Sequence, residues 1–205
     1  RGAYPNMMEE FTKYFNATKL PLSISYRCPI SHVQLAKKIV PQIESAPNAI
    51  QGLVKDITTE QVTSLANEKD FVLCRFNAPL AKIFISLIKQ GKKAVINGRE
   101  IGEELVSFIN KFKATSLDDL LVQASEFRRK QTYKLSDKDL AIGTIRKITK
   151  QIDLCEVIET LSQDKSTITE FVQFLRIVFS DQKEGIICST VHKAKGLETN
   201  CSFVL

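Results

Sequence analysis

Short, densely apolar segments constrain the fold of this chain most strongly. Three of them are rich in β-branched and aliphatic residues and lack a clean alternation of apolar and polar positions: residues 20–25, 71–76 and 185–191. Strands that are covered on both faces of a parallel sheet have this composition. Residues 201–205 form a fourth such segment, and residues 92–97 form a shorter one. The sequence therefore predicts a buried parallel sheet.

Amphipathic stretches lie between these predicted strands. Residues 31–44 carry an apolar stripe, and Ser31 and Gln34 form a capping-box pattern at its start. Residues 79–90 carry a second apolar stripe. Strand and helix in alternation indicate a layered α/β domain.

The region from residue 99 to residue 183 has a different character. It contains successive amphipathic stretches at 101–112, 117–127, 137–150, 154–163 and 167–180, with no convincing strand among them. A crossover between parallel strands normally needs only one helix, so we expect an inserted helical subdomain. The expected organisation is an α/β domain whose first part is 1–98 and whose second part is 184–205, interrupted by a helical insert at 99–183.

The charge of the chain leaves its partners open. Its 205 residues include 29 Lys and Arg against 23 Asp and Glu, a net charge of +6. Such an excess suits a polyanionic partner, but many proteins without one also show it. Two basic clusters lie in the helical region, at residues 126–130 and 146–150. Solvated helix faces are the simpler interpretation of these clusters, and a nucleic-acid track is the alternative.

Cysteine usage and hydropathy indicate the compartment. The five cysteines form no CxxC pair and lie mostly in apolar runs, which is typical of buried free thiols in a reducing environment. No apolar stretch approaches the length of a membrane span, and the chain shows no signal-peptide pattern. We expect a cytoplasmic protein without a membrane partner. Because the chain begins at Arg1 and stops inside a predicted strand, we also expect a fragment of a longer protein.

Polar residues follow three of the predicted strands. No phosphate loop, acidic metal pair or nucleophile elbow is present, so the sequence alone encodes no complete catalytic site. Ligands of open α/β sheets gather at the carboxyl ends of strands, and Arg and Tyr there suit a phosphate and a base. Without a Cys/His cluster or a carboxylate pair nearby, His192 suits hydrogen bonding or phosphate contact better than metal binding. The polar residues at these ends are Tyr26 and Arg27, then Arg75 and Asn77, then Thr190, His192, Lys193, Lys195, Gly196 and Glu198.

These segments resemble the motifs of a known enzyme family. TVHKAKGLE at residues 190–198 closely resembles motif V of superfamily 1 DNA helicases of the UvrD/Rep/PcrA type. YRCP at 26–29 resembles their motif IV, VLCRFNA at 72–78 their motif IVa, and RGA at 1–3 the tail of motif III. The helical block lies where this family inserts its accessory subdomain. The resemblance implies the second RecA-like domain, a parallel sheet covered by helices with an inserted all-helical subdomain.

The resemblance also implies roles for individual residues. In such helicases ATP lies between two RecA-like domains, and the first domain supplies the phosphate loop and the Mg²⁺ ligands. Arg27 would reach the γ-phosphate as an arginine finger, with Tyr26 stacked on adenine. Glu198 would contact the ribose or otherwise respond to nucleotide, and Gly196 would lie between the two contact regions. The residues implied in binding single-stranded DNA are Arg75, Asn77, Thr190, His192, Lys193 and Lys195.

The implied activity is that of an ATP-dependent DNA helicase or translocase acting in DNA repair or replication. Its partners would be single-stranded DNA, single-strand/duplex junctions and ATP, and the fragment alone would be inactive. One alternative is a non-catalytic helicase-like module that binds DNA or docks a protein, with the helical insert as a possible protein-binding surface. Another is the motor part of a helicase-nuclease. The chain departs from the family pattern at Thr199, where an aromatic residue is usual, and at Ser25, where Asn is usual.

Overall fold

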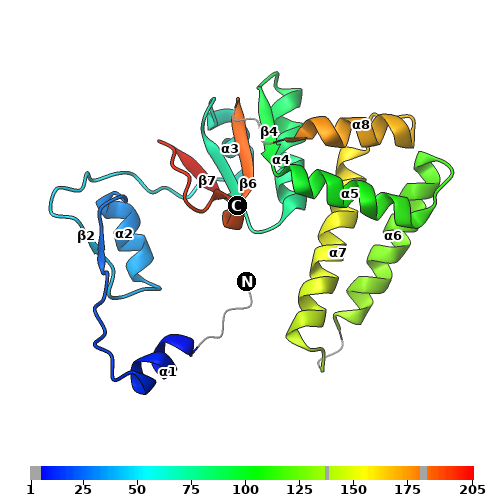
Figure 1. Cartoon of the computed structure of the whole chain (residues 1–205). Coiled ribbons are helices and arrows are strands. Elements are labelled where there is room, and N and C mark those ends of the chain that lie inside the picture. The colour runs from blue at the N-terminus through cyan, green and yellow to red at the C-terminus, as the bar shows by residue number, and fades with distance from the viewer. Residues whose placement is uncertain (1–5, 137–138, 181–183) are drawn as a thin grey trace. The chain divides into compact units, whose positions relative to one another are not determined.

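The structure of the chain is a computed structural model that describes residues 6–136, 139–180 and 184–205. The chain divides into two compact units, Arg1–Asp56 and Ile57–Leu205 (Figure 1). The RGA segment at residues 1–3 lies outside the described residues. Both units contain parallel strands with helices beside them, so the expected α/β class is confirmed at this level.

The N-terminal unit contains two helices and a two-stranded parallel sheet. In chain order its elements are α1 (Met7–Tyr14), β1 (Ile24–Ser25), α2 (Ile30–Lys37) and β2 (Glu44–Ser45). β1 pairs with β2, and neither strand belongs to the larger sheet of the second unit. The prediction that residues 20–25 form a strand of the main sheet is therefore wrong. Pro21 has no N–H group, which prevents an unbroken ladder through that segment.

The helix predicted at 31–44 is shorter than its apolar stripe. It ends at Lys37, because Pro41 disfavours the helical conformation in the residue before it and cannot donate to a helical hydrogen bond. The predicted capping box is also absent, since the N-cap position is Pro29. The hydroxyl of Ser31 instead forms a hydrogen bond with Nδ1 of His32 at 3.2 Å.

The second unit is built on a sheet of five parallel strands in the order β5-β4-β6-β3-β7. The strands are β3 (Phe71–Cys74), β4 (Ala94–Asn97), β5 (Phe179–Ser180), β6 (Ile186–Thr190) and β7 (Ser202–Val204). The predicted strands at 71–76, 92–97, 185–191 and 201–205 are thus confirmed. β5 lies where a helix was predicted. The central strand β6 is buried at every position, as its lack of alternation predicts.

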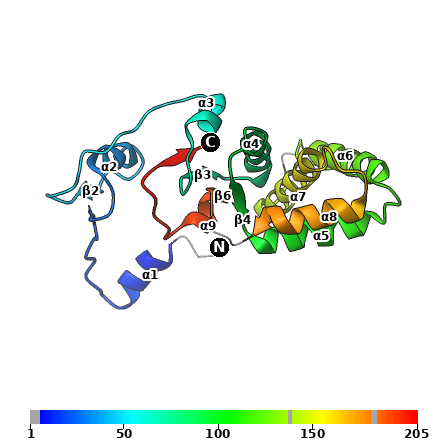
Figure 2. The same cartoon turned by 90° about the horizontal axis from the view of Figure 1, so that it is seen from above.

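Helices surround this sheet, and most of them lie in one stretch of the chain. α3 (Thr59–Leu65) and α4 (Asn77–Lys89) flank β3, and the short α9 (Val191–Ala194) follows β6. Between β4 and β5 come α5 (Arg99–Phe112), α6 (Leu117–Lys134), α7 (Ile142–Leu161) and α8 (Ile168–Val178). α5 and α8 lie side by side, and α6 and α7 form an antiparallel hairpin (Figures 1 and 2). Residues 142–150 and 154–161 of the stretches predicted separately at 137–150 and 154–163 belong to one continuous helix, α7, and residues 137–138 lie outside the described residues.

Polar caps begin three of these helices. Thr58 and Gln61 form a complete capping box at α3, with Gln61 accepting from the Thr58 N–H at 2.9 Å. Ser116 and Thr167 each accept, at 3.1 Å, from the N–H group three residues later. These side chains satisfy amide groups that have no partner within their own helix.

One hydrophobic core holds the sheet and the helices of the second unit together. Val72 and Cys188 in the sheet, Leu87 on α4, Leu105 on α5 and Ile158 on α7 are fully buried members of it. Their burial removes apolar surface from water, which is the main force that stabilises such a layered unit. Because α5 and α7 share this core, they are fixed against the strands whose ends they approach.

Candidate ligand site at the carboxyl edge of the sheet

The carboxyl ends of β3, β4 and β6 form one edge of the five-stranded sheet. Cys74, the last residue of β3, lies opposite Thr190, the last residue of β6. On the other side of β6, strand β4 ends at Asn97 and leads into α5. All three strands are parallel, so the segments that follow them emerge at the same edge. The structure therefore brings the Arg75–Asn77 segment and the Thr190–Lys195 segment next to each other, as expected.

Lys193 on α9 is held by an acidic residue at the start of α5. Its ammonium group pairs with the carboxylate of Glu100, and the Lys193 side chain is 28% exposed. The lysine passes close to Gly98, where an added Cβ would lie 2.8 Å from Nζ of Lys193. Gly98 also has a φ of +141°, a conformation that favours glycine. The β4–α5 turn is thus shaped to let this ion pair form.

Asp153 of α7 caps the first turn of α4. Its carboxylate accepts from the Asn77 backbone N–H at 3.1 Å, from Nδ2 of Asn77 at 3.0 Å and from the Ala78 N–H at 2.8 Å. Only 7% of Asp153 is exposed. The positive end of the α4 dipole and these donors stabilise the buried charge. The first turn of α4 is therefore closed by a protein carboxylate, and the amide group of Asn77 is bound to it.

A cavity of about 300 Å³ lies beside these contacts. The Oδ1 atom of Asn77 is buried there and has no hydrogen-bond partner among the described residues. Lys150 of α7 pairs with Glu104 of α5 across the same region at 2.6 Å. The cavity is lined by Asn77, Glu100, Ile101, Glu104, Lys150, Asp153, Leu154, Thr190 and Lys193. The cavity is thus lined by both acidic and basic side chains, which belong to α5, to α7 and to the segment that follows β6.

The remaining basic residues of this edge face solvent. Arg75, His192 and Lys195 are exposed. The guanidinium carbon of Arg75 lies 5.9 Å from the centre of the Phe76 ring, a cation–π contact. Thr190, in contrast, is 9% exposed and lines the cavity. Of the predicted DNA-binding residues, these three present open cationic or imidazole groups, whereas Asn77 and Lys193 contact neighbouring helices.

The segment after α9 turns back to the sheet through Gly196. Gly196 has a φ of +91°, and an added Cβ there would meet nothing within 4 Å. The Leu197 N–H donates to the Ala194 carbonyl at 2.9 Å, which closes the turn. Thr199 then donates its hydroxyl to the Lys69 carbonyl at 2.8 Å. The residue that departs from the family pattern thus anchors this segment by a hydrogen bond, and Glu198 lies exposed between the turn and the anchor.

Tyr26 and Arg27 belong to the N-terminal unit and follow β1. Tyr26 is 80% exposed, and Arg27 is also exposed. The hydroxyl of Ser25 accepts from the Cys28 N–H at 3.3 Å, which closes the turn that presents both residues. Ser25, the other departure from the family pattern, therefore shapes this turn. The expectation that this strand end joins the other two at one sheet edge is not met, because β1 lies in a different sheet.

Three cysteines, Cys155, Cys188 and Cys201, are poor nucleophiles. Burial, with a smaller contribution from Glu159, raises the pKa of Cys155 to about 12, and burial raises the pKa of Cys188 to about 12. Burial and the charge of Asp70 also raise the pKa of the exposed Cys201. A thiol attacks as its thiolate, so these three thiols are held in the unreactive form at neutral pH.

The described part of the chain shows neither a metal-binding cluster nor a membrane span. Within residues 6–136, 139–180 and 184–205, no group of three or more His, Cys, Asp or Glu side chains could hold a metal ion. None of the helices in these ranges has the length and apolar character needed to cross a bilayer. Comparison of the chain with protein-family models, with curated proteins and with solved structures found no match.

The acidic residues that lie at this edge of the sheet were not predicted from the sequence. Glu100 and Asp153 contact two of the predicted residues, but neither belongs to a motif. Asp153 lies between Ile152 and Leu154 on α7, and a charged residue beside apolar neighbours is a weak sign of a buried polar contact. The stretches predicted at 137–150 and 154–163 leave Asp153 between them. Gly98 carries the weaker signal of a glycine directly after a strand.

Proposed function

We propose that the chain is part of an ATP-dependent DNA helicase or translocase of superfamily 1, and that it contributes a RecA-like domain. Its helical insert, expected at 99–183, comprises α5 to α8 and ends before β5. The observation that carries the proposal is the pairing of Cys74 with Thr190. It places the motif IVa-like and motif V-like segments side by side at the carboxyl edge of a parallel sheet. Ligands of such sheets bind at this edge.

In this proposal the exposed residues of the edge contact single-stranded DNA. Arg75, His192 and Lys195 offer donors to phosphates without reading sequence. Thr190, Asn77 and Lys193 line the cavity behind them and join the contact surface to α5 and α7. To contact a phosphate, the ammonium group of Lys193 must leave the Glu100 carboxylate and pair with the DNA instead.

The nucleotide-binding residues of the proposal are Tyr26, Arg27, Gly196 and Glu198. Tyr26 and Arg27 are exposed, as is required of groups that reach a nucleotide held mainly by another domain. Arg27 stabilises charge on the transferring γ-phosphate, and the turn at Gly196 connects the nucleotide contact of Glu198 to the DNA contacts before it. ATP supplies the energy for movement along DNA. Its Mg²⁺ is held in this proposal by the other RecA-like domain.

DNA binding tests the proposal on the chain itself. Binding of a labelled single-stranded oligonucleotide is measured by anisotropy at several salt concentrations for the His192→Ala, Lys195→Gln double variant. We expect weaker binding and a salt slope lower by about 0.7 for each lost phosphate contact. Lys89→Gln, which removes an exposed lysine from the end of α4, is the charge-matched control. An unchanged slope in the double variant would refute the DNA-contact assignment.

ATP hydrolysis tests the motor assignment in the full-length protein. Arg27→Ala is expected to lower the turnover stimulated by single-stranded DNA roughly a thousandfold and to change nucleotide binding far less. Arg176→Ala, which removes an exposed arginine from α8, is the control and should turn over normally. Normal turnover of the Arg27 variant contradicts the finger assignment. A full-length protein that binds DNA without any DNA-stimulated hydrolysis supports the non-catalytic module instead.

A further inference from the structure

The α6–α7 hairpin concentrates the positive charge of the chain. Residues 126–151 contain eight Lys and Arg and three Asp and Glu, so this segment carries a net charge of +5 out of the +6 of the whole chain. The basic segments 126–130 and 146–150 are separate in the sequence, and they lie on the adjacent antiparallel helices α6 and α7 (Figures 1 and 2). Such a concentration raises the local potential and attracts anions.

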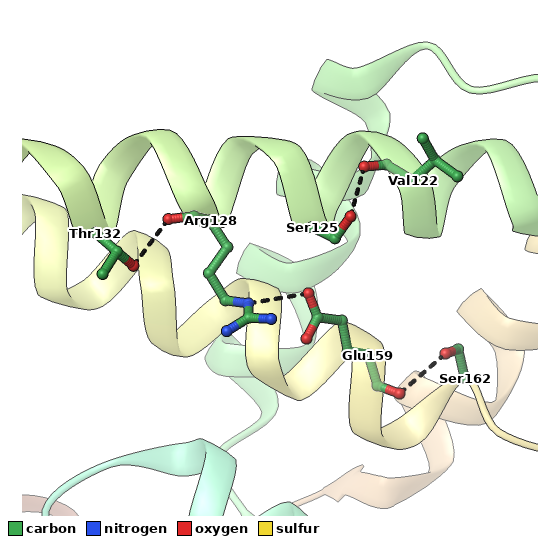
Figure 3. A network of polar contacts seen from close by, with 6 residues as sticks. All are labelled: Val122, Ser125, Arg128, Thr132, Glu159 and Ser162. Atoms are coloured by element: carbon green, nitrogen blue, oxygen red, sulfur yellow. Dashed lines mark hydrogen bonds and ion pairs between the residues drawn. The ribbon is translucent and has the colours of Figure 1, made fainter.

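Among the described residues, ion pairs neutralise only part of this charge. Arg128 donates to Glu159 of α7 at 3.0 Å and ties the two helices together (Figure 3). Lys150 pairs with Glu104 of α5. The exposed cations that form no ion pair with another described residue are Arg129, Lys130, Lys134, Arg146 and Lys147. Their mutual repulsion is relieved when an anion binds.

A groove of about 740 Å³ lies between the two helices at this end of the hairpin. Phe127, Leu140 and Ile148 give it an apolar floor, and Lys134 and Lys147 stand at it from opposite helices. This volume is large enough for a nucleotide-sized ligand. The groove therefore combines an apolar surface with cations on both sides.

Gln131 supplies an amide group to the groove. Gln131 is 8% exposed and lines the groove, and its amide group makes no hydrogen bond to another described residue. The Gln131 amide can therefore donate to and accept from a ligand that enters the groove. Tyr133, which is 82% exposed, lies where this groove meets a second hollow on the other side of α6.

We propose that the groove between α6 and α7 binds an unpaired nucleotide of a single-stranded nucleic acid. The base lies on the apolar floor and forms hydrogen bonds with the Gln131 amide, a neighbouring base stacks on Tyr133, and Lys134 and Lys147 contact the flanking phosphates. Stacking on an exposed aromatic ring beside a cationic track is how single strands are bound without sequence preference. An acidic peptide would match the charge, but it has no flat ring for the floor or for Tyr133.

This site goes beyond the proposed function, because it lies on the hairpin and uses none of the residues at the sheet edge. Its test uses the whole chain, a short labelled single-stranded oligonucleotide and a duplex of the same sequence. We expect tighter binding of the single strand. Lys134→Gln with Lys147→Gln should lower the salt slope by about 1.4, which corresponds to two phosphate contacts. Tyr133→Ala should weaken single-strand binding about tenfold, with little effect on duplex binding.

Matched controls separate this site from loss of folding and from the sheet edge. Lys89→Gln with Lys111→Gln removes two exposed lysines from other helices and should leave the salt slope nearly unchanged. The groove variants are also measured in the His192→Ala, Lys195→Gln background. There the Tyr133 variant should still lose affinity for the single strand, and the double lysine variant should still lower the salt slope, whether or not the background substitutions themselves weaken binding. Equal binding of duplex and single strand, an unchanged slope in the double lysine variant, or full competition by polyglutamate each overturns the proposal.

Discussion

The carboxylate of Asp153 accepts hydrogen bonds from both the backbone nitrogen and the side-chain nitrogen of Asn77, at 3.1 and 3.0 Å. These two contacts join helix α7 to the first turn of α4, where the chain leaves strand β3. The link is charged, nearly buried and placed beside the candidate ligand site. A substitution at Asp153 should therefore change both the stability of the chain and the arrangement of the side chains at the sheet edge.

Replacing Asp153 with Asn should destabilise the chain. The substitution keeps the size of the side chain but removes its charge and presents an N–H donor to the amides of Asn77 and Ala78. We expect a loss of about 1–3 kcal/mol in the free energy of unfolding, measured by urea denaturation. Glu126→Gln, which removes an exposed carboxylate from α6, is the control and should change stability by less than about 0.5 kcal/mol. Equal effects of the two substitutions would contradict the capping role.

Replacing Glu100 with Gln should release the ammonium group of Lys193. If the sheet edge binds single-stranded DNA, the freed lysine can contact a phosphate, so binding should tighten and the salt slope should rise by about 0.7. Glu68→Gln removes an exposed charge from the loop before β3, at the other end of the strand, and serves as the control. Weaker binding of the Glu100 variant would show that the ion pair positions Lys193 productively instead of competing with DNA.

Replacing Gly98 with Ala should disturb both the turn and the ion pair. The added Cβ would lie 2.8 Å from Nζ of Lys193 and 2.9 Å from Cδ1 of Ile101, at a φ of +141°. We expect destabilisation of about 1–3 kcal/mol, measured as a lower midpoint of urea unfolding. Gly143→Ala on α7 is the contrasting variant, since nothing lies within 4 Å of its added Cβ. Alanine favours a helix over glycine, so that change should be neutral or stabilising.

The thiols of Cys155 and Cys188 should react only after unfolding. Both side chains are fully buried, and the pKa of each is raised to about 12. Labelling of the native chain by a thiol reagent at pH 8, with sites identified by mass spectrometry, should spare these two residues and modify both in urea. Rapid native labelling of either residue would contradict its burial.

The same shifts predict an alkaline loss of stability. Each pKa rises from an ordinary 9.0 to about 12 on folding, so the folded state keeps these protons where the unfolded state loses them. The contribution is fully present below about pH 9 and is lost as the pH rises from there towards 12, by about 1.4 kcal/mol per pH unit for each thiol. Cys188→Ala should show a shallower decline in unfolding free energy above pH 9 than the parent chain. Parallel declines would refute the linkage.

Much of the second unit could be predicted because its signals are local. The strands at 71–76 and 185–191 are continuous apolar runs, and continuous runs identify buried parallel strands without knowledge of their neighbours. The two-residue strand β5 carries no such signal, since its bonds to β4 depend on where α8 ends. A strand of this length is defined by its partner and not by its own sequence.

The candidate site was predictable on its basic side only. Arg75, His192 and Lys195 follow strand ends and are exposed there, as the strand-end argument expects. Their acidic neighbours come from helices that are remote in sequence, and no periodic pattern shows which strand end a helix will approach. Residues 20–25 show the opposite error, because their local pattern resembles a buried strand, whereas only Ile24 and Ser25 form a strand and it belongs to a different sheet.

The continuity of α7 has a mechanical consequence. The helix carries Ile148 in the groove and, little more than one turn further on, Asp153 at the start of α4. A straight helix transmits a push along its axis with little compression, since its hydrogen-bond ladder is unbroken. A load applied at the hairpin tip therefore reaches the end of β3 through α7, by way of the Asp153 carboxylate and of the apolar side chains that α7 packs against α4. The helix couples the groove mechanically to the carboxyl edge of the sheet.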